Sequence, residues 1–148
     1  MTSLSQKINE LNERVDNITT QVCFVVSRGS GTVVNEGTIL PYTIIFENIG
    51  GGFDSNTYTF TCPIQGRYIF SVGFHTNGNN TYAVDIKINN QIHDTSGRAS
   101  TGSSGNSKKF IVAIAVLNLG DTVHVECVSG SIRLFAQNIS RFHGCLLE

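Results

Sequence analysis

The histidines and serines of this chain stand apart from one another, in spacings that match no catalytic motif. A nucleophile elbow needs G-x-S-x-G between a strand and a helix, and residues 102–105 (GSSG) have neither that spacing nor that context. The four histidines form no H-x-x-x-H or H-E-x-x-H pair, so a satisfied or exposed side chain is the simpler interpretation of each. We therefore expect no enzymatic activity and no cofactor. The histidines are His75, His93, His124 and His143.

Possible metal ligands are equally dispersed. No two cysteines form the C-x-x-C pair that is typical of a zinc site, and four cysteines allow three full pairings, so free thiols and disulfides both remain open. Calcium requires several carboxylate or carbonyl oxygens that converge on one point. The aspartates lie in separate segments, and we predict no metal site. The residues concerned are Cys23, Cys62, Cys127 and Cys145, with Asp54, Asp85, Asp94 and Asp121.

Length and charge limit the partners. The chain has 148 residues, which suits one domain, and its 10 Lys and Arg against 11 Asp and Glu give no attraction for nucleic acid. No apolar run reaches the roughly 20 residues that cross a bilayer, so we expect no membrane insertion. The N-terminus lacks a secretory signal, so the chain is either intracellular or a secreted form whose signal has been removed. Three possible glycosylation sequons, at Asn17, Asn79 and Asn138, favour secretion.

Residues 1–22 have the heptad pattern of a short coiled coil. Apolar residues alternate spacings of four and three, polar residues lie between them, and no Gly or Pro interrupts the pattern. Three heptads are marginal as an isolated helix in water, so we expect the seam to pack against copies of itself. The alternative is a helix that packs on its own domain. The seam consists of Leu4, Ile8, Leu11, Val15, Ile18 and Val22.

Residues 23–148 have the period of two that is typical of half-buried antiparallel strands, with Gly, Asn and Ser clusters between the strands. Roughly eight to ten short strands of this kind predict an all-β sandwich of the jelly-roll type. Residues 110–117 differ because they are apolar on both sides, which requires cover on both sides. Another subunit would supply that cover, so we assign Phe110, Val112 and Ile114 to oligomerisation.

Several segments, in a fixed order, resemble the globular head of the C1q domain family. The most informative is residues 45–74, IFENIGGGFDSNTYTFTCPIQGRYIFSVGF, in which a Gly-rich bend and the turn at Cys62 separate two apolar strands. Residues 120–123 (GDTV) and 142–147 (FHGCLL) match later positions of the same family. The resemblance covers residues 23–148 and implies a jelly roll of the C1q/tumour necrosis factor type that forms a compact homotrimer.

The resemblance also bears on the cysteines and on calcium. It implies that the first and last strands are antiparallel neighbours, which permits a disulfide between Cys23 and Cys145, although a buried free thiol at Cys145 fits equally well. We expect Cys62 and Cys127 to be reduced. Some trimers of this family bind calcium near the three-fold axis through acidic loop residues. Residues 95–107, which would lie there, contain no acid, so the prediction of no metal stands.

The resemblance implies recognition rather than catalysis. The sequence contains no Gly-X-Y collagen repeat, so it looks most like the secreted, non-collagenous members with a short coiled coil, many of them invertebrate lectins of innate immunity for microbial sugars or sialic acid. Three weak sites on one trimer gain through avidity, and an arginine can pair with a sialic-acid carboxylate. The alternatives are a receptor ligand of the cerebellin or adipokine kind and a structural trimerisation head. The residues assigned to the glycan are Asn77, Asn79, Tyr82, His93, Arg98 and Arg133.

Overall fold

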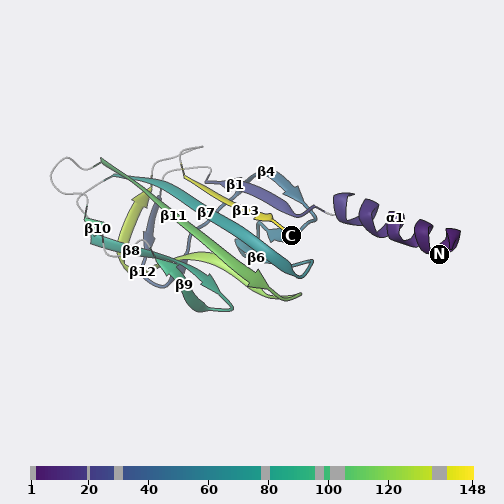
Figure 1. Cartoon of the computed structure of the whole chain (residues 1–148). Coiled ribbons are helices and arrows are strands. Elements are labelled where there is room, and N and C mark those ends of the chain that lie inside the picture. Colours follow the sequence, from purple (N-terminus) through teal and green to yellow (C-terminus); the bar gives the residue numbers. More distant parts are fainter. Residues whose placement is uncertain are drawn as a thin grey trace.

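A computed structural model of the chain shows one helix followed by an antiparallel β-sandwich (Figure 1). The structure describes residues 3–19, 21–28, 32–77, 81–95, 99–100, 106–134 and 140–148. The elements are α1 (Leu4–Thr19), β1 (Cys23–Ser27), β2 (Thr32–Asn35), β3 (Thr38–Ile39), β4 (Ile44–Ile49), β5 (Phe53–Asp54), β6 (Thr59–Thr61), β7 (Gly66–Asn77), β8 (Thr81–Ile88), β9 (Gln91–Thr95), β10 (Ala99–Ser100), β11 (Asn106–Leu117), β12 (Thr122–Leu134) and β13 (Arg141–Leu146).

The strands form two layers that share β12. One layer, which we call the β7 sheet, has the order β4-β1-β13-β7-β11. The other, the β8 sheet, has the order β9-β8-β12-β6-β5. Residues 123–130 of β12 pair with β8, whereas residues 131–134 pair with β2, and Leu134 also reaches β7. The predicted two-sheet, all-β sandwich is therefore confirmed.

An aromatic core fills the space between the sheets. The Phe24 ring of β1 lies at its centre, stacked on Phe60 at 5.0 Å and edge-on to Phe142 at 4.9 Å between ring centroids. Gly144 is required beside this cluster, because a Cβ at that position would collide with the Phe24 ring. Aromatic pairs of this kind add roughly 0.5–1.5 kcal/mol beyond their burial. The inward residues of β7 complete the core, and they are Tyr68, Phe70, Val72 and Phe74.

The helix α1 begins at a capping arrangement on Ser3. The Gln6 amide donates to Ser3 Oγ (3.2 Å), and the Ser3 amide donates to Gln6 Oε1 (3.1 Å). In Figure 1 the helix extends away from the sandwich, so it does not pack on its own domain. The seam side chains of Leu4, Ile8 and Leu11 are exposed. An apolar stripe is therefore open to a partner on this helix.

The head begins before the predicted seam ends. The heptad pattern places Val22 in the seam, but its side chain is buried in the core of the sandwich. The Leu146 amide donates to the Val22 carbonyl oxygen (2.8 Å), so the backbone at Val22 already belongs to the pairing of the first and last strands. The assignment of Val22 to the seam is therefore wrong. Val15 and Ile18 lie on α1, and their side chains are outside the described part of the chain.

Candidate functional site

A row of exposed apolar side chains follows the outward side of β11. Phe110, Val112, Ile114 and Val116 have 78%, 55%, 55% and 66% of their surface exposed. The residues between them face the core and are buried. β11 pairs with β7, and no other strand of the described chain pairs with it. A row of this kind is typical of a surface that another protein surface covers.

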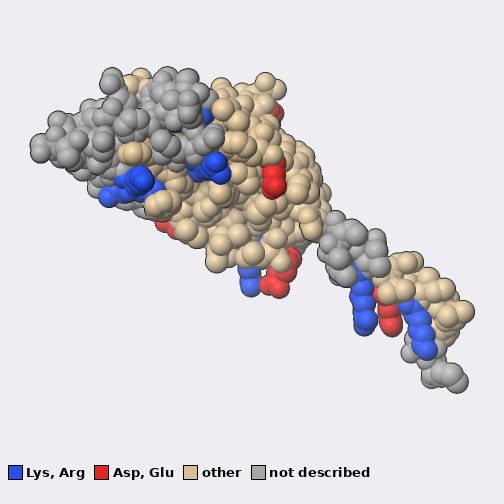
Figure 2. All heavy atoms as spheres, turned by 90° about the horizontal axis from the view of Figure 1, so that it is seen from above, with Lys and Arg blue, Asp and Glu red and all other residues tan. Residues whose placement is uncertain are grey.

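Apolar side chains also cross the outward side of the β7 sheet in one line, and we call this side of the sheet the apolar face. The strand registers bring one residue from each of its five strands into a single line across the sheet. Ile45 and Phe46 add exposed apolar surface at β4. Figure 2 views the molecule from above and shows Lys and Arg (blue) and Asp and Glu (red) side chains scattered over the head. The line consists of Ile49, Cys23, Cys145, Ile69 and Ile114.

A disulfide lies within this line. Cys23 and Cys145 are directly opposite each other on β1 and β13, and their sulfurs are bonded (S–S 2.02 Å, Cα–Cα 4.1 Å). Cys62 and Cys127 are free and buried, as expected. Burial raises the pKa of the Cys127 thiol, which therefore keeps its proton at neutral pH and is a poor nucleophile. Both free thiols of the described chain are thus covered, and the disulfide lies on the apolar face.

A groove of about 460 Å³ lies between the β8–β9 hairpin and β11. The hairpin turns at Asn89 and Asn90, whose φ values of 51° and 65° suit a two-residue turn. The Asn89 side-chain Nδ2 donates to Asp121 Oδ1 (3.0 Å), which fixes the turn. β9 then places the His93 ring Nε2 at 3.2 Å from the Ile114 carbonyl oxygen. The groove is lined by Ile88, Asn89, Gln91, Ile92, His93, Ile114, Ala115 and Val116.

A smaller hollow of about 190 Å³ opens on the apolar face beside Phe110. Gly73 makes room for it, because a Cβ at Gly73 would lie 2.9 Å from the Phe110 ring. Arg141 is opposite Gly73 on β13, and its guanidinium covers the Phe46 ring at 4.8 Å from the centroid. Burial, followed by the charge of Arg141, lowers the pKa of His143. His143 is therefore neutral at pH 7, and Arg141 supplies the charge at this part of the face.

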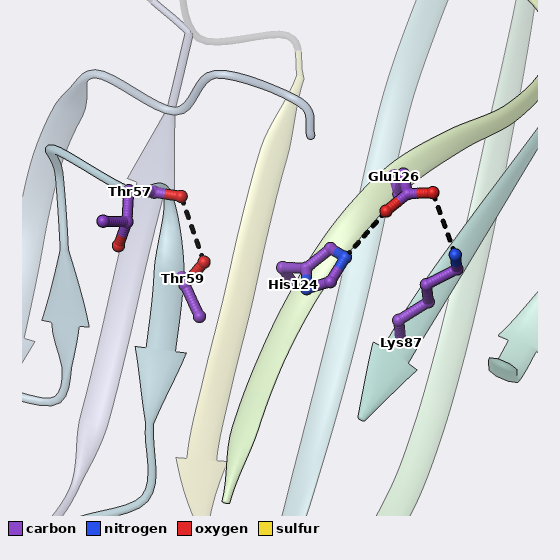
Figure 3. A network of polar contacts seen from close by, with 5 residues as sticks. All are labelled: Thr57, Thr59, Lys87, His124 and Glu126. Atoms are coloured by element: carbon purple, nitrogen blue, oxygen red, sulfur yellow. Dashed lines mark hydrogen bonds and ion pairs between the residues drawn. The ribbon is translucent and has the colours of Figure 1, made fainter. Parts of the chain in front are cut away.

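The outward side of the β8 sheet carries a polar network instead. The Lys87 ammonium donates to Glu126 Oε2 (2.9 Å), and the His124 ring Nε2 lies 3.0 Å from Glu126 Oε1 (Figure 3). Burial acts to raise the pKa of Glu126, but the hydrogen bonds from Lys87 and His124 outweigh it and lower the pKa. Figure 3 also shows the Thr59 hydroxyl, which donates to the Thr57 carbonyl oxygen (3.0 Å).

This network holds strands together and is poorly placed to meet a ligand. The side chains of Lys87, His124 and Glu126 have 18%, 4% and 17% of their surface exposed. Among the described residues, no group of three or more His, Cys, Asp or Glu side chains is placed to hold a metal ion. Lys87 comes from β8 and the other two residues from β12, so the network fastens the two central strands of the β8 sheet to each other.

Strands β7, β11 and β12 begin or end at the end of the sandwich opposite α1, which we call the distal end (Figure 1). β7 ends here at Asn77, opposite Asn106 at the start of β11. β12 ends here as well, because Leu134 pairs with Thr76. The predicted ligand residues Asn77 and Arg133 therefore lie close together in the backbone. Asn79 and Arg98 lie outside the described residues, as does the sequon at Asn138; Asn17 is on α1, and its side chain is not described.

Two other predicted ligand residues lie elsewhere. His93 is in the groove beside β11, away from the distal end. Tyr82 is assigned to the glycan by the sequence, but its side chain is buried and packs edge-on against Phe74 at 6.0 Å between centroids. Tyr82 occupies an inward position of β8, in phase with the buried Val84 and Ile86. The assignment of Tyr82 to ligand contact is therefore wrong.

Comparisons with known proteins agree with this architecture. The family model described as the C1q domain matches residues 23–147. The globular domain of the zebrafish complement 1qA protein superimposes with a TM-score of 0.70 at 19% identity, over 87% of this chain and 98% of that chain. Eiger TNF from S. frugiperda gives 0.66 at 13% identity, over 86% and 93%. Murine APRIL, crystallised at pH 5.0, gives 0.62 at 11% identity, over 86% and 100%.

No curated protein sequence matches the chain. Because the identities to the solved structures are low, those similarities establish the fold alone. The assignment to a family rests on the family model. Within the described residues, no helix has both the length and the apolar character to span a membrane.

Proposed function

The chain belongs to the C1q domain family, and from this we propose that it is a secreted recognition protein that assembles as a homotrimer and binds glycans. C1q/TNF-like domains are generally binding or signalling modules, and homologues with this fold are trimers. The dispersed titratable groups of this chain suit a binding role. The observation that carries the proposal is the apolar face, because exposed apolar patches mark surfaces that another protein covers.

The energetics of the apolar face favour full coverage of the sheet. Fully burying a side chain such as Ile114 contributes about 1.5–3 kcal/mol. Association costs about 4–15 kcal/mol in translational and rotational freedom. Scaled by their exposed fractions, the four side chains of β11 supply about 4–8 kcal/mol, which matches only the lower part of that cost. We therefore infer that the partner copy also covers the rest of the face, from Ile69 on β7 to Ile49 on β4.

The helix α1 fits the same assembly. Its exposed residues Leu4, Ile8 and Leu11 keep the four-and-three spacing of a coiled-coil seam. The seam is too short to hold copies together in isolation. Heads joined through the apolar face would bring the helices to high local concentration, so the coiled coil adds to the assembly that the heads begin.

The distal end is the surface we assign to the ligand. It lies opposite the helix in Figure 1, so a trimer would present three copies of it away from the stalk. Asn77 and Arg133 are close there in the backbone, and arginine can bind a carboxylate in two hydrogen bonds. Three weak sites on one rigid body bind a surface rich in acidic sugars far more tightly than one site does.

Secretion is supported by the cross-strand disulfide. Structural disulfides persist in oxidising compartments and are rare in the reducing cytosol. The bond between Cys23 and Cys145 fits the former setting. We place the protein outside the cell on this basis.

The test combines solution mass with glycan binding. We expect light scattering of the full chain to give three times the 16.1 kDa of one chain, and a shortened chain lacking residues 1–20 to keep that ratio. This shortened chain retains Val22, whose loss would damage the core. We also expect Arg133→Gln to lower glycan-array signal without changing mass. A single-chain mass would overturn the trimer, and silence on sialylated and microbial glycans would favour a receptor ligand.

A further inference from the structure

The Cys23–Cys145 disulfide lies inside the surface that the proposed assembly covers. Its two strands are in the middle of the β7 sheet, and their registers place Ile49 on one side of the sulfur pair and Ile69 on the other. Ile114 of the exposed β11 row follows one strand further on. Both cysteines are half-buried in the single chain. The bond is thus partly open to solvent in one copy and surrounded by the residues that a second copy would contact.

The same disulfide fastens the point at which the helix joins the head. Cys23 is the first residue of β1, and the helix ends at Thr19, four residues earlier. Cys145 lies on the last strand, 122 residues away in sequence. Beside the bond, the Leu146 amide donates to the Val22 carbonyl oxygen. Without the bond, the first strand would be held at this junction by hydrogen bonds and packing alone.

From this placement we propose that assembly protects the disulfide from small thiols, and that its reduction weakens assembly. The inference rests on the trimer proposed above. In the reaction, a thiolate attacks one cysteine sulfur and expels the other as a thiolate, which takes up a proton. A second thiol then resolves the mixed disulfide. Overall, two small thiols are oxidised to one disulfide, and the protein bond becomes two cysteine thiols.

Each half of the proposal has a physical cause. The attacking sulfur must approach along the axis of the protein bond, and a second copy seated on the apolar face would block that approach. Once the bond is cleaved, β1 and β13 lose their cross-link in the middle of the face. Assembly must then order those strands as well, which lowers its free-energy gain. The covalent state of the chain would thereby set how readily single chains assemble.

The first experiment compares rates of reduction by dithiothreitol, with the thiols counted by maleimide labelling. The comparison variant is Phe110→Ser with Val112→Ser, which weakens assembly without adding a charge that would repel a thiolate. We expect the wild-type trimer to be reduced several-fold more slowly than this variant. Dilution of the wild type below its dissociation concentration should remove the difference. Equal rates in a wild type that light scattering shows to be trimeric would overturn the proposal and leave the trimer intact.

Two buried thiols provide an internal control for unfolding. Cys62 and Cys127 are covered in the folded chain, so maleimide reaches them only when the domain opens. Labelling of these two in step with Cys23 and Cys145 would show that reduction requires unfolding, and would overturn the proposal.

The second experiment measures the mass of reduced, alkylated wild type against concentration. We expect its trimer to dissociate at a concentration several-fold higher than the oxidised protein does. An unchanged dissociation curve would sink the second half of the proposal. If the oxidised wild type is a single chain at every concentration, the trimer and this inference both fail.

Discussion

The two outward faces of the sandwich have the same strand period and opposite chemistry. On the β7 sheet, the outward positions of β11 are all apolar from Phe110 to Val116 and remain exposed. On the β8 sheet, the outward positions hold Lys87, His124 and Glu126, and the Glu126 carboxylate binds both of the other side chains. The polar face is thus satisfied within one chain. The apolar face is the surface that we propose a second chain covers.

The comparison extends to how each face holds a cation. Arg141 on the apolar face rests on the Phe46 ring, whereas Lys87 on the polar face is paired with the Glu126 carboxylate. An arginine on an aromatic ring adds little polarity to a surface that would lose its water in the proposed assembly. An ion pair with a carboxylate suits a surface that no second chain covers. The contacts of Arg141 and Lys87 are therefore both consistent with the proposed assembly, in which only the apolar face is covered.

The largest effect should come from placing the same acid on each face. Val112→Asp puts a charge in the exposed β11 row, so covering that row would require burial of an unpaired carboxylate. We expect the trimer to be lost at concentrations where the wild type is fully assembled, as measured by light scattering. Thr61→Asp, at an exposed position of the β8 sheet, is the matched control and should leave the mass unchanged. Equal effects of the two substitutions would contradict the division of the faces.

Much of this division can be predicted from the sequence. Residues 110–117 are apolar at every position, and a strand of that kind in an otherwise alternating domain predicts cover on both sides. The order of motifs from residue 45 to residue 147 indicated the family, and the family supplied the pairing of first and last strands. That pairing brought Cys23 and Cys145 together. These features depend on local pattern and strand order, which a sequence carries.

The errors arise where the answer depends on phase or on register. Tyr82 follows an Asn-rich loop, and its inward direction is apparent only when it is counted with Val84 and Ile86 as one strand. Val22 fits the heptad pattern, but its backbone already bonds to the last strand of the head, so the head begins before the pattern ends. The polar network was missed because His124 and Lys87 are opposite each other only in the actual β8–β12 register. A period of two predicts on which side of the sheet each residue lies. It does not predict which residue of the next strand lies opposite.

The next largest effect tests the polar face. Glu126→Gln removes the charge that both Lys87 and His124 bind in a largely covered site, so we expect the free energy of unfolding to fall by about 1–3 kcal/mol. Urea unfolding at one fixed protein concentration measures it. The control is Glu148→Gln, which breaks an exposed pair with Arg67 and should cost less than about 1 kcal/mol. A smaller loss at Glu126 than at Glu148 would show that the network does not stabilise the β8 sheet.

The pH dependence of stability gives a finer test of the same face. The folded chain lowers the pKa of Glu126 from its ordinary value of 4.5, so the folded state binds this proton less readily than the unfolded state. The stabilisation is complete above pH 4.5 and is lost as pH falls through the lower folded pKa. We expect urea midpoints to decline more steeply below pH 4.5 in the wild type than in Glu126→Gln. Parallel declines would mean that other carboxylates account for the acid sensitivity.

The smallest expected effect concerns the cation of the apolar face. A cation over an exposed ring contributes about 0.5–1 kcal/mol, so Phe46→Leu should lose that amount while keeping most of the apolar contact, and Phe46→Tyr should lose little. A double-mutant cycle with Arg141→Gln, in urea unfolding, isolates the coupling from the other contacts of each residue. Arg141 makes a further contact, so a cycle is required in place of a single substitution. A coupling near zero would mean that the Phe46 ring does not stabilise the Arg141 guanidinium. The two faces would then differ only in that Lys87 has a carboxylate partner.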